Sequence, residues 1–194
     1  METVKFGNYY FEATREERKP VSWLVIKEDK GKKLLLSKYG IDLRSFNAEW
    51  QNVSWDASSL RRWLNDTFLH ACFSEAEREK IINDVVRPDP NPLFPRAAQG
   101  KKTKDKIFIL SISQCLEALG SDGTELMLNA TPYAKKIGAA TFPFESNKCF
   151  WWLRNTGEEP DCACYISNEG VINYEGIVVD YAGYVVRPAM WVKK

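Results

Sequence analysis

The apolar runs of this sequence are too short to build anything but strands and small helices. The longest, such as Ile107–Leu110, have the length of a strand and fall far short of a membrane span. One helix is predicted from apolar residues three or four positions apart on a single face: Leu60, Trp63, Leu64, Phe68 and Cys72. Strands followed by short helices, and strands again in the last part of the chain, favour the α+β class.

Two hairpins are expected among the strands. Val21–Ile26 and Lys33–Ser37 flank a polar turn at Glu28–Gly31, which predicts a loop of four or five residues. Cys162–Ser167 and Gly170–Tyr174 pair across a tight turn at Asn168-Glu169. The remaining expected strands are Gly7–Phe11, Lys106–Leu110, Phe150–Arg154 and Gly183–Trp191.

Capping signals predict where further helices begin. Ser74 is followed three residues later by Glu77, and Ser111 by Gln114, and both pairs match the capping box. Gly120 is suited to end the second of these helices in a left-handed conformation. A short helix is also expected near Pro132–Ile137.

Length and composition favour one domain over residues 1–194, with a mobile surface loop at about 87–105. The chain has 194 residues, of which 44% are hydrophobic and 27% charged, which are globular values. The loop is predicted because prolines at 88, 90, 92 and 95 remove backbone donors. The lysines at 101, 102, 104 and 106 form either a solvated stretch or a phosphate- or partner-binding patch.

Net charge and cysteine number bear on partners and compartment. The 27 Lys and Arg against 26 Asp and Glu give a net charge of +1, so no nucleic-acid partner is expected. Met1–Tyr10 lacks the apolar core of a secretion signal, and five cysteines is an odd number for a fully oxidised framework. We expect a cytoplasmic protein with reduced thiols and no membrane insertion, with an extracellular protein as the open alternative.

Several spaced blocks carry a family resemblance. Trp55-Asp56, Ser59-Leu60-Arg61 and Trp63-Leu64-Asn65 resemble the signature of a bacterial domain of unknown function, family 6273, which has no assigned activity. The order of Trp151-Trp152, Arg154 and Val186-Arg187-Pro188 also looks like C-type-lectin-like folds, including the sulfatase-modifying-factor branch. That likeness implies twisted antiparallel sheets flanked by two or three helices, with ligand-binding loops at one end.

Trp151 and Trp152 are neighbours on a strand and therefore point to opposite faces. If the sheet is covered on one side only, one of them is buried and the other packs under a helix or lines a groove. An exposed ring would be a platform for a sugar or a cation. Arg154 and Arg187 are expected either to hold structural partners or to bind a carboxylate or phosphate.

The other candidate groups give no convincing catalytic or metal site. Cys162 and Cys164 lie too far apart on a strand for an easy disulfide, and His70, the single histidine, is predicted to face outward. Glu159-Pro160-Asp161 is similar to the calcium-binding loop of C-type lectins, but an acidic turn is the alternative. We assign no catalytic residue, no metal and no cofactor.

These observations favour a non-enzymatic module that binds a glycan or a peptide. Its surface is expected at the loops around Asn155–Asp161 and Tyr174–Gly183. The candidate ligand-binding residues are Trp152, Arg154, Asn155, Glu159, Asp161, Tyr174 and Arg187. The alternatives are a hydrolase or modifying enzyme that uses acidic residues or a thiol, and a structural interaction domain of a larger assembly. The sequence does not determine the oligomeric state.

Overall fold

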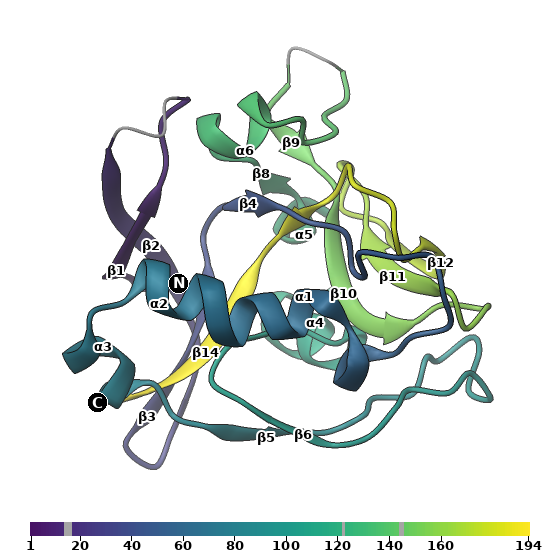
Figure 1. Ribbon diagram of the computed structural model, residues 1–194, viewed down its shortest axis with the longest axis horizontal. Helices are drawn as coiled ribbons and strands as arrows, with labels where there is room; N and C mark the ends of the chain where they lie inside the picture. Colours follow the sequence, from purple (N-terminus) through teal and green to yellow (C-terminus); the bar gives the residue numbers. More distant parts are fainter. Residues whose placement is uncertain (14–16, 122, 144–145) are drawn as a thin grey trace.

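Two five-stranded sheets and several short helices make up the fold in the computed structural model (Figure 1). The structure describes residues 1–13, 17–121, 123–143 and 146–194. Helices and largely antiparallel sheets coexist, so the predicted α+β class is confirmed. No helix within the described ranges is long and apolar enough to cross a membrane.

The first sheet joins the two ends of the chain. Its strand order is β1-β2-β3-β14-β7, and every neighbouring pair is antiparallel. Its strands are β1 (Thr3–Tyr10), β2 (Arg18–Asp29), β3 (Lys32–Ser37), β7 (Phe108–Ile109) and β14 (Pro188–Lys193). β1 and the hairpin of β2 and β3 were predicted near these positions.

The second sheet has the order β12-β11-β10-β13-β4. Its strands are β4 (Asp42–Leu43), β10 (Trp151–Thr156), β11 (Cys162–Ile166), β12 (Ile172–Val178) and β13 (Val185–Val186). The expectation of antiparallel sheets holds except for β10 and β13, which pair in parallel. The parallel pair is possible because the β11–β12 hairpin and a loop lie between these two strands in the chain.

The final expected strand, Gly183–Trp191, is in fact two strands in two sheets. β13 pairs with β10 and β4, whereas β14 pairs with β3 and β7. Arg187 is the one residue between β13 and β14, so the chain crosses from one sheet to the other at this position. Figure 1 shows this crossing as the yellow segment that runs between the sheets.

A continuous helical segment covers one side of the molecule, as the apolar stripe predicted. It consists of α1 (Ser59–Trp63), a π-helical turn (Leu64–Phe68) and α2 (Leu69–Cys72). Ser58 caps its start by accepting the Arg61 amide, and a 3₁₀ turn (Trp55–Ala57) precedes it. Leu60, Leu64 and Phe68 are fully buried on its inner face.

The other helices begin largely where the capping signals placed them. Both predicted capping boxes are present, at Ser74 and at Ser111, and Gly120 ends its helix at φ +78°. The helices are α3 (Glu75–Lys80), α4 (Ile112–Leu119), α5 (Gly123–Leu126) and α6 (Pro132–Lys136). A small sheet of β8 (Leu128–Asn129) and β9 (Lys148–Cys149) lies near α6.

The predicted hairpins are confirmed, but their turns differ. β2 and β3 are joined by two residues, Lys30 at φ 34° and Gly31 at φ 84°, instead of four or five. Positive φ at both positions is the geometry that matches the twist of paired strands. The second hairpin turns over Ser167–Val171, because the Ser167 amide donates to the Val171 carbonyl.

Both tryptophans of β10 belong to the core, so neither ring is the exposed platform that a sheet covered on one side only would offer. Trp151 and Trp152 are each fully buried. The Trp151 indole donates to the Leu126 carbonyl of α5, and the Trp152 indole donates to the Arg44 carbonyl on the opposite face. At β10 the second sheet is therefore covered on both faces.

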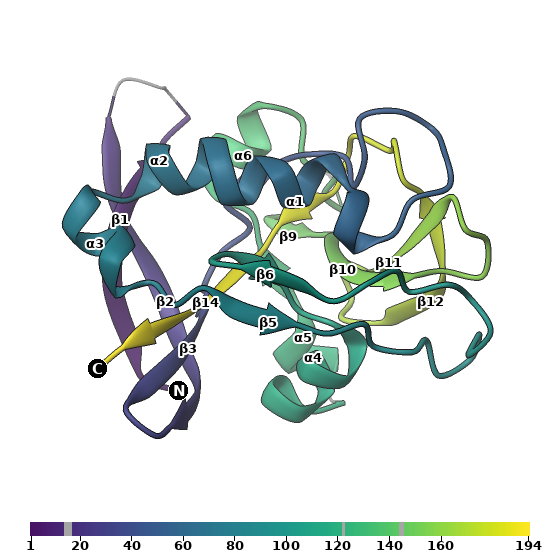
Figure 2. The same cartoon turned by 60° about the horizontal axis from the view of Figure 1, so that its bottom comes forward.

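The predicted loop at 87–105 is the tip of a two-stranded ribbon. β5 (Asp84–Val86) and β6 (Thr103–Asp105) pair in antiparallel fashion, and residues 87–102 connect them. Figure 2 shows this ribbon beside α1, with the connection reaching toward the β10–β11 turn. The ribbon therefore brings the tip of its loop to the end of the second sheet.

Candidate functional site

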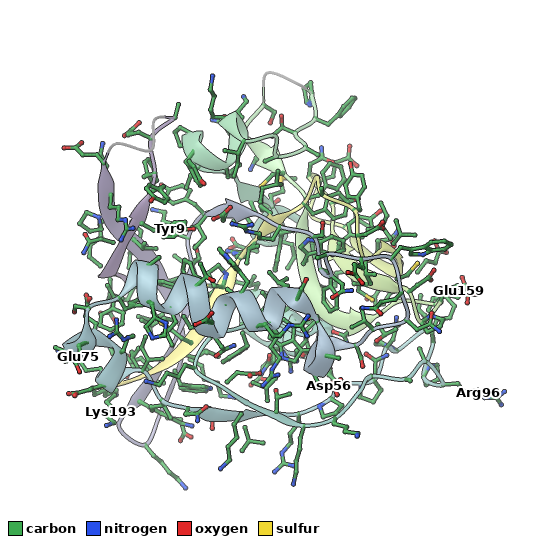
Figure 3. All side chains as sticks on the ribbon, viewed as in Figure 1. Tyr9, Asp56, Glu75, Arg96, Glu159 and Lys193 are labelled. Atoms are coloured by element: carbon green, nitrogen blue, oxygen red, sulfur yellow. The ribbon has the colours of Figure 1, made fainter. Side chains whose placement is uncertain are left out.

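A groove lies between the tip of the ribbon loop and the turn that follows β10. We name it the loop groove, and its volume is about 480 Å³. Its lining residues are Leu93, Phe94, Pro95, Arg96, Ala97, Ala98, Glu158 and Pro160. The side chains are mostly apolar, with a guanidinium on one wall and a carboxylate on the other. Figure 3 shows that Arg96 and Glu159, the residue after Glu158, project at the same end of the molecule.

Asn91 anchors the first half of the ribbon loop. Its side chain is completely buried. The amide nitrogen donates to the carbonyls of Thr156 (3.1 Å) and Tyr174 (2.8 Å). The amide oxygen accepts the backbone N–H groups of Leu93 (3.1 Å) and Phe94 (3.4 Å). One side chain therefore joins the groove wall to both β10 and β12.

Gln99 and Thr156 anchor the second half. The Gln99 carbonyl oxygen accepts the Thr156 amide at 2.8 Å, and the Thr156 hydroxyl donates to the Ala98 carbonyl at 2.9 Å. Because Asn91 also reaches Thr156, both ends of the segment converge on the last residue of β10. This arrangement fixes the position of the loop that forms one wall of the groove.

The opposite wall depends on a glycine. A β-carbon at Gly157 would lie 2.1 Å from the Glu175 carbonyl oxygen, so the turn and β12 approach too closely for any side chain. The Glu158 amide donates to that same carbonyl at 2.9 Å. This close approach sets the position of Glu158 and Pro160 on the groove wall.

Charge is segregated around the loop groove. Residues 155–186 contain six acidic side chains and no lysine or arginine, whereas residues 87–104 contain five basic side chains and one acidic. Glu158 and Glu159 are exposed on the acidic side, and Arg96 is exposed on the basic side. A ligand in the groove therefore meets opposite charges on its two walls.

An exposed tryptophan stands next to the acidic wall. Trp50 is 68% exposed, and its indole N–H donates to the Asp161 carboxylate at 2.6 Å. The Val53 amide donates to the Pro160 carbonyl at 3.1 Å, which joins the Trp50 loop to the same turn. The fluorescence of Trp50 should therefore respond to a ligand that binds at this wall.

Two of the predicted ligand-binding residues are instead enclosed in the core. Trp152 has no exposed ring face. Arg187 is buried, donates to the Ser37 carbonyl at 3.1 Å, and lies over the Trp151 ring at 4.7 Å. Burial lowers the pKa of its guanidinium to about 10, so it stays charged at neutral pH. Both residues have the structural partners that were the stated alternative.

Arg154 and Asn155 lie beneath the ribbon loop. Arg154 is 7% exposed, and its guanidinium donates to the Ile109 carbonyl and to the Gln114 side chain. Asn155 accepts the Ile112 amide at 2.8 Å and donates to the Asp89 carbonyl at 2.7 Å. These bonds join β10 to the start of α4 and to the ribbon, so the two residues support the groove from below.

The remaining three predicted residues are closer to solvent. Glu159 is exposed next to the groove, and Asp161 binds Trp50. Tyr174 is half-buried, and its carbonyl receives the Asn91 amide. The prediction of a surface at the turn after β10 therefore coincides with one wall of the groove.

The facing wall was not predicted. Asn91 and Leu93 lie in a proline-rich stretch that was predicted as a mobile surface loop, with a binding role considered only for its lysines. Trp50 had no sequence pattern around it. The one available signal was a lone Asn between two prolines, Pro90 and Pro92, with an apolar Leu-Phe pair following. Neither residue type nor spacing indicated what Asn91 contacts.

The cysteines are unsuited to nucleophilic chemistry at neutral pH. Burial raises the pKa of the Cys115, Cys149 and Cys164 thiols to about 12. Burial and the carboxylate of Asp161 raise the pKa of Cys162 to about 11. These thiols are therefore protonated at pH 7.

His70 and the acidic turn Glu159-Pro160-Asp161 are the remaining candidates for catalysis or metal binding. His70 lies on the exposed side of α2, where its ring nitrogen contacts the Asp66 carbonyl at 2.8 Å. Within the described part of the chain, no three histidine, cysteine, aspartate or glutamate side chains cluster as metal ligands would.

Comparison with known proteins gives one match. The model of a family described as Domain of unknown function (DUF6273) matches residues 30–194. No curated protein and no solved structure matches the chain. The matched range includes all of the loop groove and leaves out β1 and β2.

Proposed function

This chain belongs to the family described as Domain of unknown function (DUF6273), and we propose that it is a non-enzymatic binding module whose loop groove takes a segment of a partner protein. The observation that carries the proposal is the fixed, mostly apolar groove between the ribbon loop and the turn after β10. Apolar pockets with a few placed polar groups are the usual form of a ligand site.

A peptide fits the groove better than a glycan. Leu93, Phe94, Pro95 and Pro160 offer apolar contact, whereas Arg96 and Glu158 are the charged side chains among the described lining residues. A glycan needs many hydrogen-bond partners beside a flat aromatic ring. A peptide needs an apolar anchor in a desolvated pocket and few polar contacts around it.

The scaffold that we propose is C-type-lectin-like, in a bacterial protein. Two twisted sheets with helices at their sides, and long loops gathered beyond the end of β10, support this assignment (Figures 1 and 2). Because fold does not fix function, the proposal for the binding surface stands on the groove alone.

The raised thiol pKa values favour a binding role over the thiol-dependent alternative. A cysteine nucleophile needs its thiolate, and the environments of Cys115, Cys149, Cys162 and Cys164 all favour the protonated form. The buried carboxylate of Asp105 is bound to Arg61 at 2.7 Å, which leaves it in a structural ion pair.

The proposal is tested by selecting peptides from a random displayed library on the purified protein. Affinities of the isolates are measured from Trp50 emission, because a ligand beside Asp161 changes the surroundings of this exposed indole. Leu93→Asp places a charge in the groove at a side chain that is 62% exposed, so folding is preserved. We expect it to weaken binding by about tenfold or more, since apolar anchors dominate such interfaces.

Val171→Asp is the matched control, because Val171 is 59% exposed and lies at the far end of the β11–β12 hairpin. It should leave the affinity unchanged. The proposal fails if the isolates bind Leu93→Asp as well as the parent protein. It also fails if a glycan panel yields ligands that Leu93→Asp rejects while the peptide library yields none.

A further inference from the structure

The ribbon stem below the loop groove presents a row of basic side chains on its outer face. Val85 of β5 lies directly opposite Lys104 of β6, and both are exposed. Arg87 directly follows β5 and Lys102 directly precedes β6, and both are exposed as well. We name these four residues the basic ribbon.

The inner face of the stem fixes this orientation. Asp105 is buried and accepts hydrogen bonds from Arg61 at 2.7 Å and from the Trp55 indole at 3.0 Å. The hydroxyl of Thr103 also donates to this carboxylate. Since Thr103 and Asp105 are held inward, Lys104 between them points to solvent, and Lys102 just before the strand is exposed as well.

The charges of the basic ribbon have no partner within the described part of the chain. None of its three basic side chains forms an ion pair there, whereas five lysines elsewhere on the surface do. Those paired lysines are Lys19, Lys27, Lys32, Lys33 and Lys194. Three exposed positive charges without an ion pair therefore lie close together on one ribbon.

We propose that the basic ribbon binds an acidic, extended segment of a partner protein. Alternate residues of a strand are about 6.8 Å apart, so Lys102 and Lys104 match acidic side chains at every second position of an extended peptide. Val85 gives such a segment an apolar contact between the charges.

Two other anionic partners fit the surface less well. A single-stranded nucleic acid needs aromatic side chains on which its bases stack. The exposed aromatic side chains of the described residues are Trp50, Phe142 and Tyr181, and none belongs to the ribbon. An anionic membrane is bound by larger basic clusters together with apolar residues that insert.

This inference is independent of the loop groove, and its test uses different ligands. The probes are two labelled synthetic peptides of equal composition, one with glutamate and threonine in alternation and one with all glutamates in a block. Binding to the whole protein is followed by fluorescence anisotropy at low salt. We expect the alternating peptide to bind about fivefold more tightly, because only it matches the strand spacing.

Charge reversal identifies the surface. The double variant Lys102→Glu with Lys104→Glu should weaken binding of the alternating peptide by about tenfold or more. The control is Lys38→Glu with Lys136→Glu, which makes the same change in net charge at exposed lysines elsewhere. The milder pair Lys102→Gln with Lys104→Gln keeps the test valid if the reversed variant does not fold.

Several results would overturn the inference. Equal affinity for both peptides, or equal loss in the ribbon and control variants, would mean only general electrostatic attraction. Tighter binding of oligothymidylate or of phosphatidylserine vesicles than of the alternating peptide would assign a different partner class. Salt-sensitive self-association without any peptide would assign the acidic segment to residues 155–186 of a second copy.

Discussion

Replacement of Asn91 by alanine tests whether the ribbon loop is fixed in position as described. The substitution removes two hydrogen bonds to the second sheet and two within the loop. Each is worth about 0.5 to 1.5 kcal/mol net, and the loop amides can turn to water. The cost in unfolding free energy should therefore be about 2 to 4 kcal/mol.

Two assays separate local from global effects. With a urea dependence of about 2 kcal/mol per molar, the expected loss moves the unfolding midpoint down by about 1 to 2 M. Under native conditions, trypsin should cut after Arg96 about tenfold faster or more, because the anchored loop opens locally. Asn91→Asp should be at least as damaging, since it loses the donor and sets a carboxylate against the Thr156 and Tyr174 carbonyls.

Asn168→Ala is the matched control. Its side chain makes one exposed hydrogen bond, to the Phe142 carbonyl at 2.9 Å, so its loss should cost less than about 0.5 kcal/mol. If Asn91→Ala falls within that same range and trypsin cuts no faster, the loop is not anchored by this residue. The groove would then lack the fixed wall on which the proposed function depends.

Three further predictions concern other parts of the structure. Gly157→Ala should lower the unfolding free energy by about 3 kcal/mol, measured by thermal melting, because the new β-carbon would meet the Glu175 carbonyl oxygen. Gly120→Ala should lower it by only about 1 kcal/mol, because the space around Gly120 is open and only its φ of +78° opposes the change. Burial opposes ionisation of Asp89, but hydrogen bonds from Ser111, Ser113 and Asn155 outweigh it and lower its pKa below 3.8. Its stabilising effect is thus complete above the unfolded-state pKa and lost as the pH falls through the folded value, so Asp89→Asn should flatten the acid side of the stability–pH curve. A thiol reagent at pH 8 should modify Cys162 slowly and the other four cysteines only after unfolding, and Cys162→Ser should abolish the native reaction.

Local signals in the sequence predicted the local structure well. The capping boxes at Ser74 and Ser111 need partners only three residues away, so their outcome does not depend on the rest of the fold. The helical stripe from Leu60 to Cys72 succeeded for a similar reason, because its period is set within the segment.

Long-range contacts decided what the sequence could not show. Asn91 binds Thr156 and Tyr174, which are 65 and 83 positions away, so its role depends on the tertiary fold. Trp152 was a candidate platform because a sheet covered on one side only would leave a ring exposed. The segment around Arg44, 108 positions away in the sequence, covers Trp152. The two-residue turn at Lys30-Gly31 was missed because lysine seldom adopts a positive φ.

The buried arginine between β13 and β14 connects the scaffold to the binding surface. Arg187 lies where the chain changes sheets, donates to Ser37 at the end of β3, and stacks on Trp151 at the start of β10. It therefore fixes the start of β10 relative to the first sheet, although its buried charge has no carboxylate partner among the residues that the structure describes. The other end of β10 is Thr156, on which Asn91 and Gln99 converge. Because Arg187 fixes the start of β10, the far end of the strand can hold the ribbon loop in a constant position. The loop groove needs this support, since the ribbon loop forms one of its walls.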